Sequence, residues 1–311
     1  MAHASTPDAT AILRRFHVPD DPRWFAAAGD ANGRAWIAGL PALVDMLRAR
    51  WRLTLEDGGA RFGYHALVLP VMRGGDPCVL KLTWQTRRTV IEARALAVWD
   101  GHGAVRLLAA DTERGALLLE RLDAGRTLAD LEVFAAAAEA GRLMRRLTVP
   151  APPGIRGLRD FSAGVADSLE SRQARLGHPV PARWLELARR LAGQLGAEAT
   201  DQLLVHGDLH YGNVLAGERE PRLAIDPKPI AGEPEYGVPE LLWTRADEVS
   251  DAVGIRRLMA ILVESAELDA ARARCWAIAR GVDYWLWGLE HGLTDDPERC
   301  RRMLAAFAGA A

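Results

Sequence analysis

The segment of residues 205–229 contains three polar side chains whose combination could support phosphoryl transfer. Asp208 is followed five residues later by Asn213, and Asp226 stands directly after an apolar run. A carboxylate can orient an attacking hydroxyl group and accept its proton, while a further carboxylate and a carboxamide supply the hard oxygen ligands that Mg²⁺ takes beside nucleotide phosphates. These residue types therefore indicate a reaction that transfers a phosphoryl group to a hydroxyl.

The spacing around Asp208 favours the same interpretation. His206 precedes it by two residues and Asn213 follows it by five, as in the catalytic loop of kinases. A surface turn rich in Asp and Asn is one alternative. A transition-metal site built on His206, Asp208 and His210 is another. Such sites usually take three or four ligands, however, and the remaining histidines have no complementary spacing.

The first 120 residues or so, which precede these side chains, predict a strand-rich lobe. Residues 67–71 and 78–82 are apolar runs on either side of a glycine-containing turn, which is typical of a β-hairpin. Two further runs flank a Glu-Arg-Gly turn at 113–115. Helices are expected at 36–51 and 88–99.

The rest of the chain predicts a mainly helical lobe. Two short apolar runs, 203–205 and 223–225, frame the polar loop that holds Asp208. We therefore expect an α+β fold with an N-terminal lobe of residues 1–122 and a C-terminal lobe of residues 123–311. Helices are expected at 128–147, 160–175 and 182–196, and from Pro239 to the end except for turns near Gly254 and at 292–297.

The composition narrows the class of protein. The chain has 311 residues, of which 49% are hydrophobic and 26% charged, the balance of a soluble globular protein large enough for two lobes. A formal net charge of −2 argues against nucleic acid as a partner. Three scattered cysteines indicate neither a disulfide framework nor a metal site. With no apolar run of membrane-spanning length and no apparent signal peptide, we expect a cytoplasmic monomer without membrane contact.

The motif HGDLHYGN at 206–213, followed by an IDP segment, resembles the aminoglycoside phosphotransferase family. His210, two residues after Asp208, is similar to these small-molecule kinases, whereas protein kinases tend to place Lys there. Three further segments resemble one branch of the family, the streptomycin 6-phosphotransferases and hydroxyurea phosphotransferases. These segments are AWIAGLPALV, VRLLAADTERGALLLERLDAGRTL and RLAIDPKP. The resemblance runs from about Ala35 to about Thr294.

This resemblance implies a two-lobed, protein-kinase-like fold and ATP as the phosphoryl donor. In the helical lobe it implies that Asp208 is the catalytic residue and that Asn213 and Asp226 bind Mg²⁺. No D-F-G motif is present, because Asp226 is followed by Pro227, Lys228 and Pro229. The two prolines fix the backbone around Asp226, so we expect a preset metal ligand rather than a switchable loop. Lys228, between the prolines, could contact phosphate or point to solvent.

In the strand-rich lobe the resemblance implies that Lys81 binds the α- and β-phosphates and that Glu92 pairs with it. The run LLLERL, which contains Glu120 and ends at Leu122, matches the hinge whose backbone would bind adenine. An edge-strand lysine that points to solvent remains an alternative for Lys81. For Glu92 the alternative is a solvated helix glutamate that pairs with Arg88.

The resemblance also points to a cationic acceptor, namely streptomycin phosphorylated at its 6-hydroxyl. Hydroxyurea or another small metabolite is an alternative acceptor, and a nucleotide-binding scaffold without turnover is an alternative of another class. Streptomycin carries guanidinium groups, so carboxylates should line its pocket. The candidates after Asp226 are Glu233, Glu235, Glu240, Asp247, Glu264, Glu267, Asp269, Asp283 and Glu290.

Overall fold

The computed structural model describes residues 26–56, 60–200 and 202–308. Contacts between residues divide the chain into two compact units. The first holds residues up to 101 together with 105–121, and the second holds 102–104 together with 122 to the end. The first unit is strand-rich and the second mainly helical, which confirms the α+β prediction.

The first unit is built on an antiparallel sheet with the strand order β1-β3-β4-β6-β5, to which β2 adds by pairing with β3. The predicted hairpin is β3 with β4, and Gly74 and Gly75 form its turn with φ angles of 61° and 97°. These left-handed angles suit glycine and match the twist of a two-residue hairpin. The strands are β1 (Leu53–Leu55), β2 (Arg61–Phe62), β3 (Ala66–Arg73), β4 (Asp76–Thr83), β5 (Leu107–Asp111) and β6 (Ala116–Glu120).

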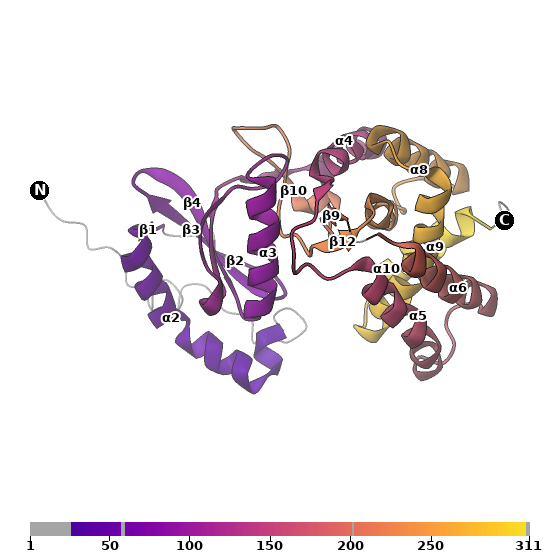
Figure 1. Ribbon diagram of the computed structural model, residues 1–311, viewed down its shortest axis with the longest axis horizontal. Helices are drawn as coiled ribbons and strands as arrows, with labels where there is room; N and C mark the ends of the chain where they lie inside the picture. Colours follow the sequence, from indigo (N-terminus) through magenta and orange to yellow (C-terminus); the bar gives the residue numbers. More distant parts are fainter. Residues whose placement is uncertain (1–25, 57–59, 201, 309–311) are drawn as a thin grey trace, which may run out of the picture. The chain divides into compact units, whose positions relative to one another are not determined.

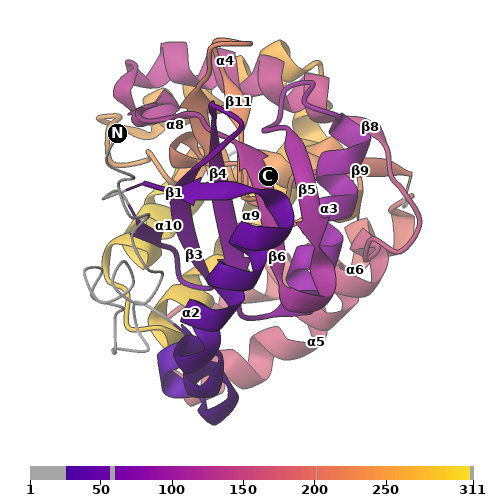
Figure 2. The same cartoon turned by 90° about the vertical axis from the view of Figure 1, so that its left-hand side faces the viewer.

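Two helices lie on opposite sides of this sheet (Figures 1 and 2). Helix α2 (Ala31–Trp51) buries Leu40, Val44 and Leu47 against the alternate strand residues that include Leu80 and Leu82. Side chains alternate between the two faces of a strand, so Lys81 points to the opposite face, toward α3 (Thr86–Trp99). Short 3-10 turns, η1 (Ala26–Gly29) and η2 (Thr112–Arg114), complete the unit.

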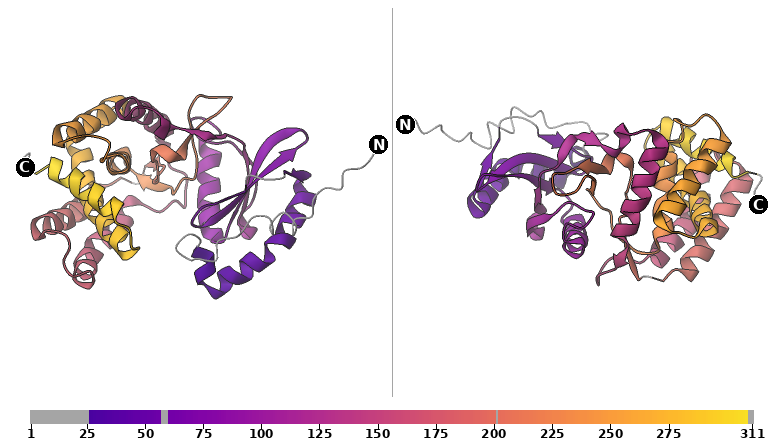
Figure 3. Two further views of the ribbon diagram at one scale, coloured as in Figure 1. Left: turned by 180° about the vertical axis from the view of Figure 1, so that it is seen from behind. Right: turned by 90° about the horizontal axis from the view of Figure 1, so that it is seen from above.

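Seven α-helices of the described chain belong to the second unit, where several pack side by side (Figure 3). None of the described helices is long and apolar enough to cross a membrane. Their bounds are α4 (Val133–Leu147), α5 (Leu158–Arg175), α6 (Ala182–Glu198), α7 (Val238–Trp243), α8 (Ala252–Ala266), α9 (Ala270–Glu290) and α10 (Asp295–Ala306).

Several boundaries of the second unit differ from the sequence prediction. The helix expected from residue 128 begins at Val133, because Leu128–Asp130 form the 3-10 turn η3 and the Glu132 side chain caps α4 by accepting from Phe134 N–H and Ala135 N–H. Gly254 lies inside α8, and the break falls at residues 244–251 instead.

Two small sheets, which the sequence did not predict, hold the polar loops of the second unit. One has the order β11-β10-β7 and the other β12-β9-β8. The short apolar runs at 203–205 and 223–225 therefore lie in different sheets. The strands are β7 (Asp123–Thr127), β8 (Val149–Pro150), β9 (Leu203–Val205), β10 (Val214–Ala216), β11 (Leu223–Ala224) and β12 (Ile230–Gly232), with the turns η4 (Tyr211–Asn213) and η5 (Pro234–Gly237).

Candidate active site

Two loops of the second unit run side by side because the strands at their ends pair with each other. The first loop, residues 206–213, leaves β9 and enters β10, and the second, residues 225–229, leaves β11 and enters β12. Strand β9 pairs with β12, and β10 pairs with β11. The loops are also joined directly, since Ile225 N–H donates to Asn213 O and Lys228 N–H donates to His206 O, each at 2.9 Å. The topology thus brings together residues that lie about 20 positions apart.

Asp208 and Asn213 meet within the first loop. The Asn213 amide nitrogen donates to the backbone oxygen of Asp208 at 2.9 Å and lies 3.4 Å from its carboxylate oxygen Oδ2. Asn213 is buried, whereas the Asp208 side chain keeps 15% of its surface exposed. Because the amide nitrogen is turned toward Asp208, the amide oxygen Oδ1 is the atom that can serve a cation.

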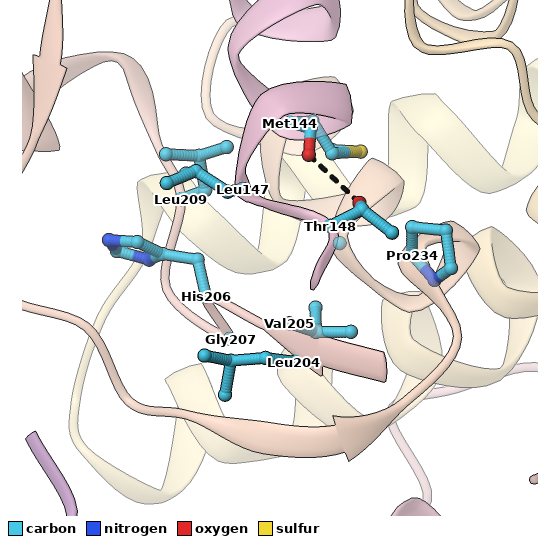
Figure 4. A pocket seen from close by; sticks show the side chains of 10 residues that line it. Met144, Leu147, Thr148, Leu204, Val205, His206, Gly207, Leu209 and Pro234 are labelled. Carbon is cyan, nitrogen blue, oxygen red and sulfur yellow. Dashed lines mark hydrogen bonds between the residues drawn. The ribbon is translucent and has the colours of Figure 1, made fainter. Parts of the chain in front are cut away.

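His206 supports the loop in its neutral form. Its Nε2 lies 3.1 Å from the carbonyl oxygen of Ile225, and its Nδ1 accepts from Asp208 N–H at 3.4 Å. This pair of contacts requires a proton on Nε2 and none on Nδ1. Burial lowers the pKa of His206 to about 4, against the opposing charges of Asp208 and Asp226. His206 and Gly207 also line an apolar pocket with Met144, Leu147 and Leu209 (Figure 4).

The second loop holds its backbone in an unusual conformation. Asp226 has a φ of 54°, in the left-handed region that costs a non-glycine residue of order 1–3 kcal/mol, and Pro227 follows directly. Gly207, with a φ of 76°, faces this loop so closely that a Cβ atom there would collide with the carbonyl oxygen of Lys228. Only glycine therefore allows the two loops to approach as they do.

Lys228 stands two residues after Asp226, and the sequence left open whether it contacts phosphate or points to solvent. Its Nζ lies 2.8 Å from Oδ2 of Asp208, although 53% of the lysine side chain is exposed. Its position two residues after Asp226 was visible in the sequence, but the contact with Asp208 depends on the pairing of the two loops.

The donors in these loops fit Mg²⁺ better than a transition metal. The described residues contain no group of three or more His, Cys, Asp and Glu side chains that could hold a metal ion. Both ring nitrogens of His206 are engaged with backbone groups, so the His206-x-Asp208-x-His210 metal site is disfavoured. A carboxylate from Asp226 and an amide oxygen from Asn213 are hard donors, and Mg²⁺ commonly takes one or two such ligands together with phosphate oxygens and waters.

In the first unit, the structure brings Lys81 and Glu92 together. The lysine Nζ lies 2.7 and 2.8 Å from the two carboxylate oxygens, and both side chains are buried. Arg88, the alternative partner of Glu92, instead donates to Gln85 at 2.6 Å on the exposed side of α3. Lys81 is thus neither a solvent-facing edge lysine nor an unpaired buried charge.

The two residues expected at the hinge lie where the first unit ends. Glu120 is the last residue of β6, and its carboxylate accepts from Arg106 N–H at 2.7 Å. Leu122 is the first residue of the long segment of the second unit, and it is partly buried near Gly217.

Most of the carboxylates proposed to bind a cationic acceptor already contact arginines. Glu233, Asp283 and Glu290 are examples, because Arg272 holds Glu233 at 2.6 Å while Arg172 contacts both Asp283 and Glu290. The other acid–arginine pairs are Glu240–Arg280, Asp247–Arg299 and Glu267–Arg145. A cationic acceptor would therefore have to compete with resident guanidinium groups at these positions.

Among these carboxylates, Glu240 has a pKa that is affected by the charge of Asp208. It is buried and lies 2.8 Å from Arg280, which also stacks on the rings of Tyr236 and Trp243. Burial raises the pKa of Glu240, Arg280 opposes this effect, and the negative charge of Asp208 adds to it. The arginine thus holds in place a buried acid whose pKa is raised by burial and by the charge of Asp208.

Comparison with known proteins agrees with this arrangement. Residues 50–292 match the family model described as aminoglycoside/hydroxyurea antibiotic resistance kinase. The chain belongs to this family. Within it, the chain is 43% identical to a streptomycin 6-kinase of Streptomyces griseus, over 89% of this chain and 92% of the relative. It is 44% identical to a hydroxyurea phosphotransferase of Kitasatospora aureofaciens, over 87% and 79% respectively. The protein is accordingly a small-molecule kinase.

Solved structures of similar fold support the kinase-like architecture of this family member. The apo form of a thermostable mutant of the aminoglycoside phosphotransferase APH(4)-Ia matches with a TM-score of 0.61 at 17% identity, over 86% of this chain and 99% of that one. Choline kinase LicA from Streptococcus pneumoniae matches with a TM-score of 0.54 at 13% identity, over 86% and 99%. The predicted kinase-like fold is confirmed.

Proposed function

We propose that this kinase transfers the γ-phosphoryl group of MgATP to the 6-hydroxyl of streptomycin, and that it acts in the cytoplasm as a monomer. Phosphoryl transfer is supported by one observation: backbone hydrogen bonds hold the loop of Asp208 and Asn213 against the loop of Asp226. The identities of 43% and 44% to two streptomycin 6-kinases support the acceptor.

In this proposal Asp208 orients the acceptor hydroxyl and takes its proton. The hydroxyl oxygen forms a bond to the γ-phosphorus while the bond from that phosphorus to the bridging β–γ oxygen breaks, and ADP leaves. Asn213 Oδ1 and the Asp226 carboxylate would hold Mg²⁺, which supplies neutralisation of the charge on the phosphates. His206 holds the backbone of Asp208 in place.

On the nucleotide side, Lys81 would bind the α- and β-phosphates while Glu92 orients its ammonium group. The backbone near Glu120 and Leu122 would bind adenine. The 44% identity to a hydroxyurea phosphotransferase makes hydroxyurea the second candidate acceptor.

The test is ADP release by the purified protein with MgATP in the presence of streptomycin, hydroxyurea, kanamycin or no acceptor. We expect turnover with streptomycin, and mass spectrometry of the product should locate the phosphate on the 6-hydroxyl. Turnover only with hydroxyurea would reject the proposed acceptor and keep the kinase mechanism. ATP binding without phosphate transfer to any acceptor would favour a scaffold role.

A further inference from the structure

Lysine is almost absent from this chain, and the two lysines that are present lie at the two places just described. The sequence contains 39 Lys and Arg residues, of which only Lys81 and Lys228 are lysines. Arginine thus supplies nearly all of the positively charged Lys and Arg side chains. A lysine differs from arginine by offering a compact ammonium group with three donors in place of a planar fork. Lys81 and Lys228 are therefore positions where a small point charge is the better fit.

The backbone of Lys228 is held firmly against the loop of Asp208. Its N–H donates to His206 O at 2.9 Å, and its carbonyl oxygen abuts Gly207, where a Cβ atom would collide with it. Pro227 and Pro229 flank it and restrict the chain on both sides. About half of the side chain is exposed, and its ammonium group lies 2.8 Å from Asp208 Oδ2. The protein therefore holds a cation beside the proposed catalytic base.

The proposed reaction would bring a second anion, the γ-phosphoryl group, close to Asp208. Asp208 must approach the hydroxyl that attacks a γ-phosphoryl group, and both the carboxylate and the phosphoryl oxygens are negatively charged. A fixed cation that contacts both reduces their repulsion and stabilises the charge that the phosphoryl oxygens carry in the transition state. An ammonium group with three donors can contact Asp208 and a phosphoryl oxygen at once.

We propose that Lys228 is a catalytic residue that bridges Asp208 and the γ-phosphoryl group of the bound nucleotide. This inference rests on the proposed use of MgATP but does not depend on which acceptor is used. The competing explanation is that Lys228 is only a counter-ion of Asp208, which the acceptor displaces when it binds.

The scarcity of lysine permits a direct test of proximity. An acyl phosphate of ATP carries a reactive carbonyl on its terminal phosphate. A nearby lysine amine attacks this carbonyl, the bond from the carbonyl to the phosphate oxygen breaks, an amide forms with loss of a proton from the amine, and ATP leaves. After trypsin digestion, an acyl group on Lys228 appears in the peptide 223–245, because Pro229 blocks cleavage after Lys228, and an acyl group on Lys81 appears in 74–87.

We expect both lysines to be acylated, and both to be protected by excess MgATP. Acylation of Lys81 without Lys228 would overturn the inference while leaving ATP binding intact. Acylation of neither would reject nucleotide binding, and the inference with it. Acylation of Lys228 that excess MgATP does not reduce would also overturn it, because the reaction would then be unrelated to the nucleotide.

Kinetics then test the catalytic role with the acceptor that turns over. Lys228→Met should lower kcat by about 10²–10³, as loss of one electrostatic stabiliser does, with little change in the acceptor KM. Lys228→Arg should restore only part of the loss, because it restores the positive charge but not the compact ammonium group. Arg189→Met is the matched control, since Arg189 is an exposed cation that pairs with Glu170 at 2.6 Å and has no role in the site. An unchanged or raised kcat in Lys228→Met would identify Lys228 as a displaced counter-ion.

Discussion

The ammonium group of Lys81 lies within 2.8 Å of both carboxylate oxygens of Glu92, and the two side chains are buried between β4 and α3. Removal of one partner leaves an uncompensated buried charge, which costs about 3–5 kcal/mol. Glu92→Ala should therefore lower the free energy of unfolding by that amount, and it should also raise the KM for ATP. Urea unfolding and steady-state kinetics measure the two effects.

A double variant separates these two roles of the pair. Lys81→Met with Glu92→Leu replaces both charges by apolar groups, which is often nearly neutral for stability. We expect stability close to that of the original protein but no turnover. Appreciable activity in the double variant would show that the pair only supports the fold.

Asp208 is the residue on which turnover should depend most. Asp208→Ala should lower kcat by about 10²–10⁴, the range for loss of a general base, while MgADP binding is retained. The control is Asp160→Ala, at an exposed position of α5. Turnover of Asp208→Ala near that of the control would remove Asp208 from the mechanism.

The dependence of the rate on Mg²⁺ concentration should change when Asp226 is altered. Asp226→Asn keeps the shape of the side chain but removes its charge, so the Mg²⁺ concentration for half-maximal rate should rise roughly 10–100-fold. Asn213→Ala should act in the same direction. The measurement is an Mg²⁺ titration of initial rate at saturating ATP. An unchanged titration midpoint in both variants would exclude them as ligands.

The approach of the two loops depends on Gly207. Gly207→Ala introduces a Cβ atom that collides with the Lys228 carbonyl oxygen, in addition to a left-handed φ. Gly177 provides a matched control, because it has a φ of 74° but no atom within 4 Å of a built Cβ. Gly177→Ala should cost only about 1–2 kcal/mol of stability and no activity. Gly207→Ala should cost more stability and also lower kcat; equal behaviour of the two variants would contradict the close-approach argument.

The stability of the fold should depend on pH through His206. Its pKa is about 4 in the folded protein and near 6.5 when exposed, so below pH 6.5 the unfolded chain takes up a proton that the folded protein does not. Neutral His206 therefore contributes its full stabilisation of the fold above pH 6.5, and this stabilisation is lost progressively as the pH falls toward 4. Between pH 7.5 and pH 5 this loss amounts to roughly 2 kcal/mol. His206→Gln should be less stable at pH 7.5 but show a smaller pH dependence in urea unfolding; an identical dependence would reject the assignment.

Local patterns in the sequence determined much of this protein. The hairpin of β3 and β4 follows from two apolar runs around Gly74 and Gly75, and α2 follows from its apolar periodicity. The types and spacing of Asp208, Asn213 and Asp226 indicated phosphoryl transfer, because that chemistry needs a base and hard oxygen ligands in a fixed relation. These features depend on residues close together in the chain, and for that reason they can be predicted from the sequence.

Contacts between distant segments were decided only by the tertiary structure. The strands β7, β8, β10 and β12 have two to five residues each, too few to show a periodicity, and they exist because β7 pairs with β10 while β8 and β12 pair with β9. The position of Lys228 against Asp208 follows from those pairings and from the glycine at 207. Likewise, the sequence offered nine acidic residues for a cationic acceptor, but only the fold revealed that most of them already contact arginines, because ion pairs across helices depend on packing rather than spacing.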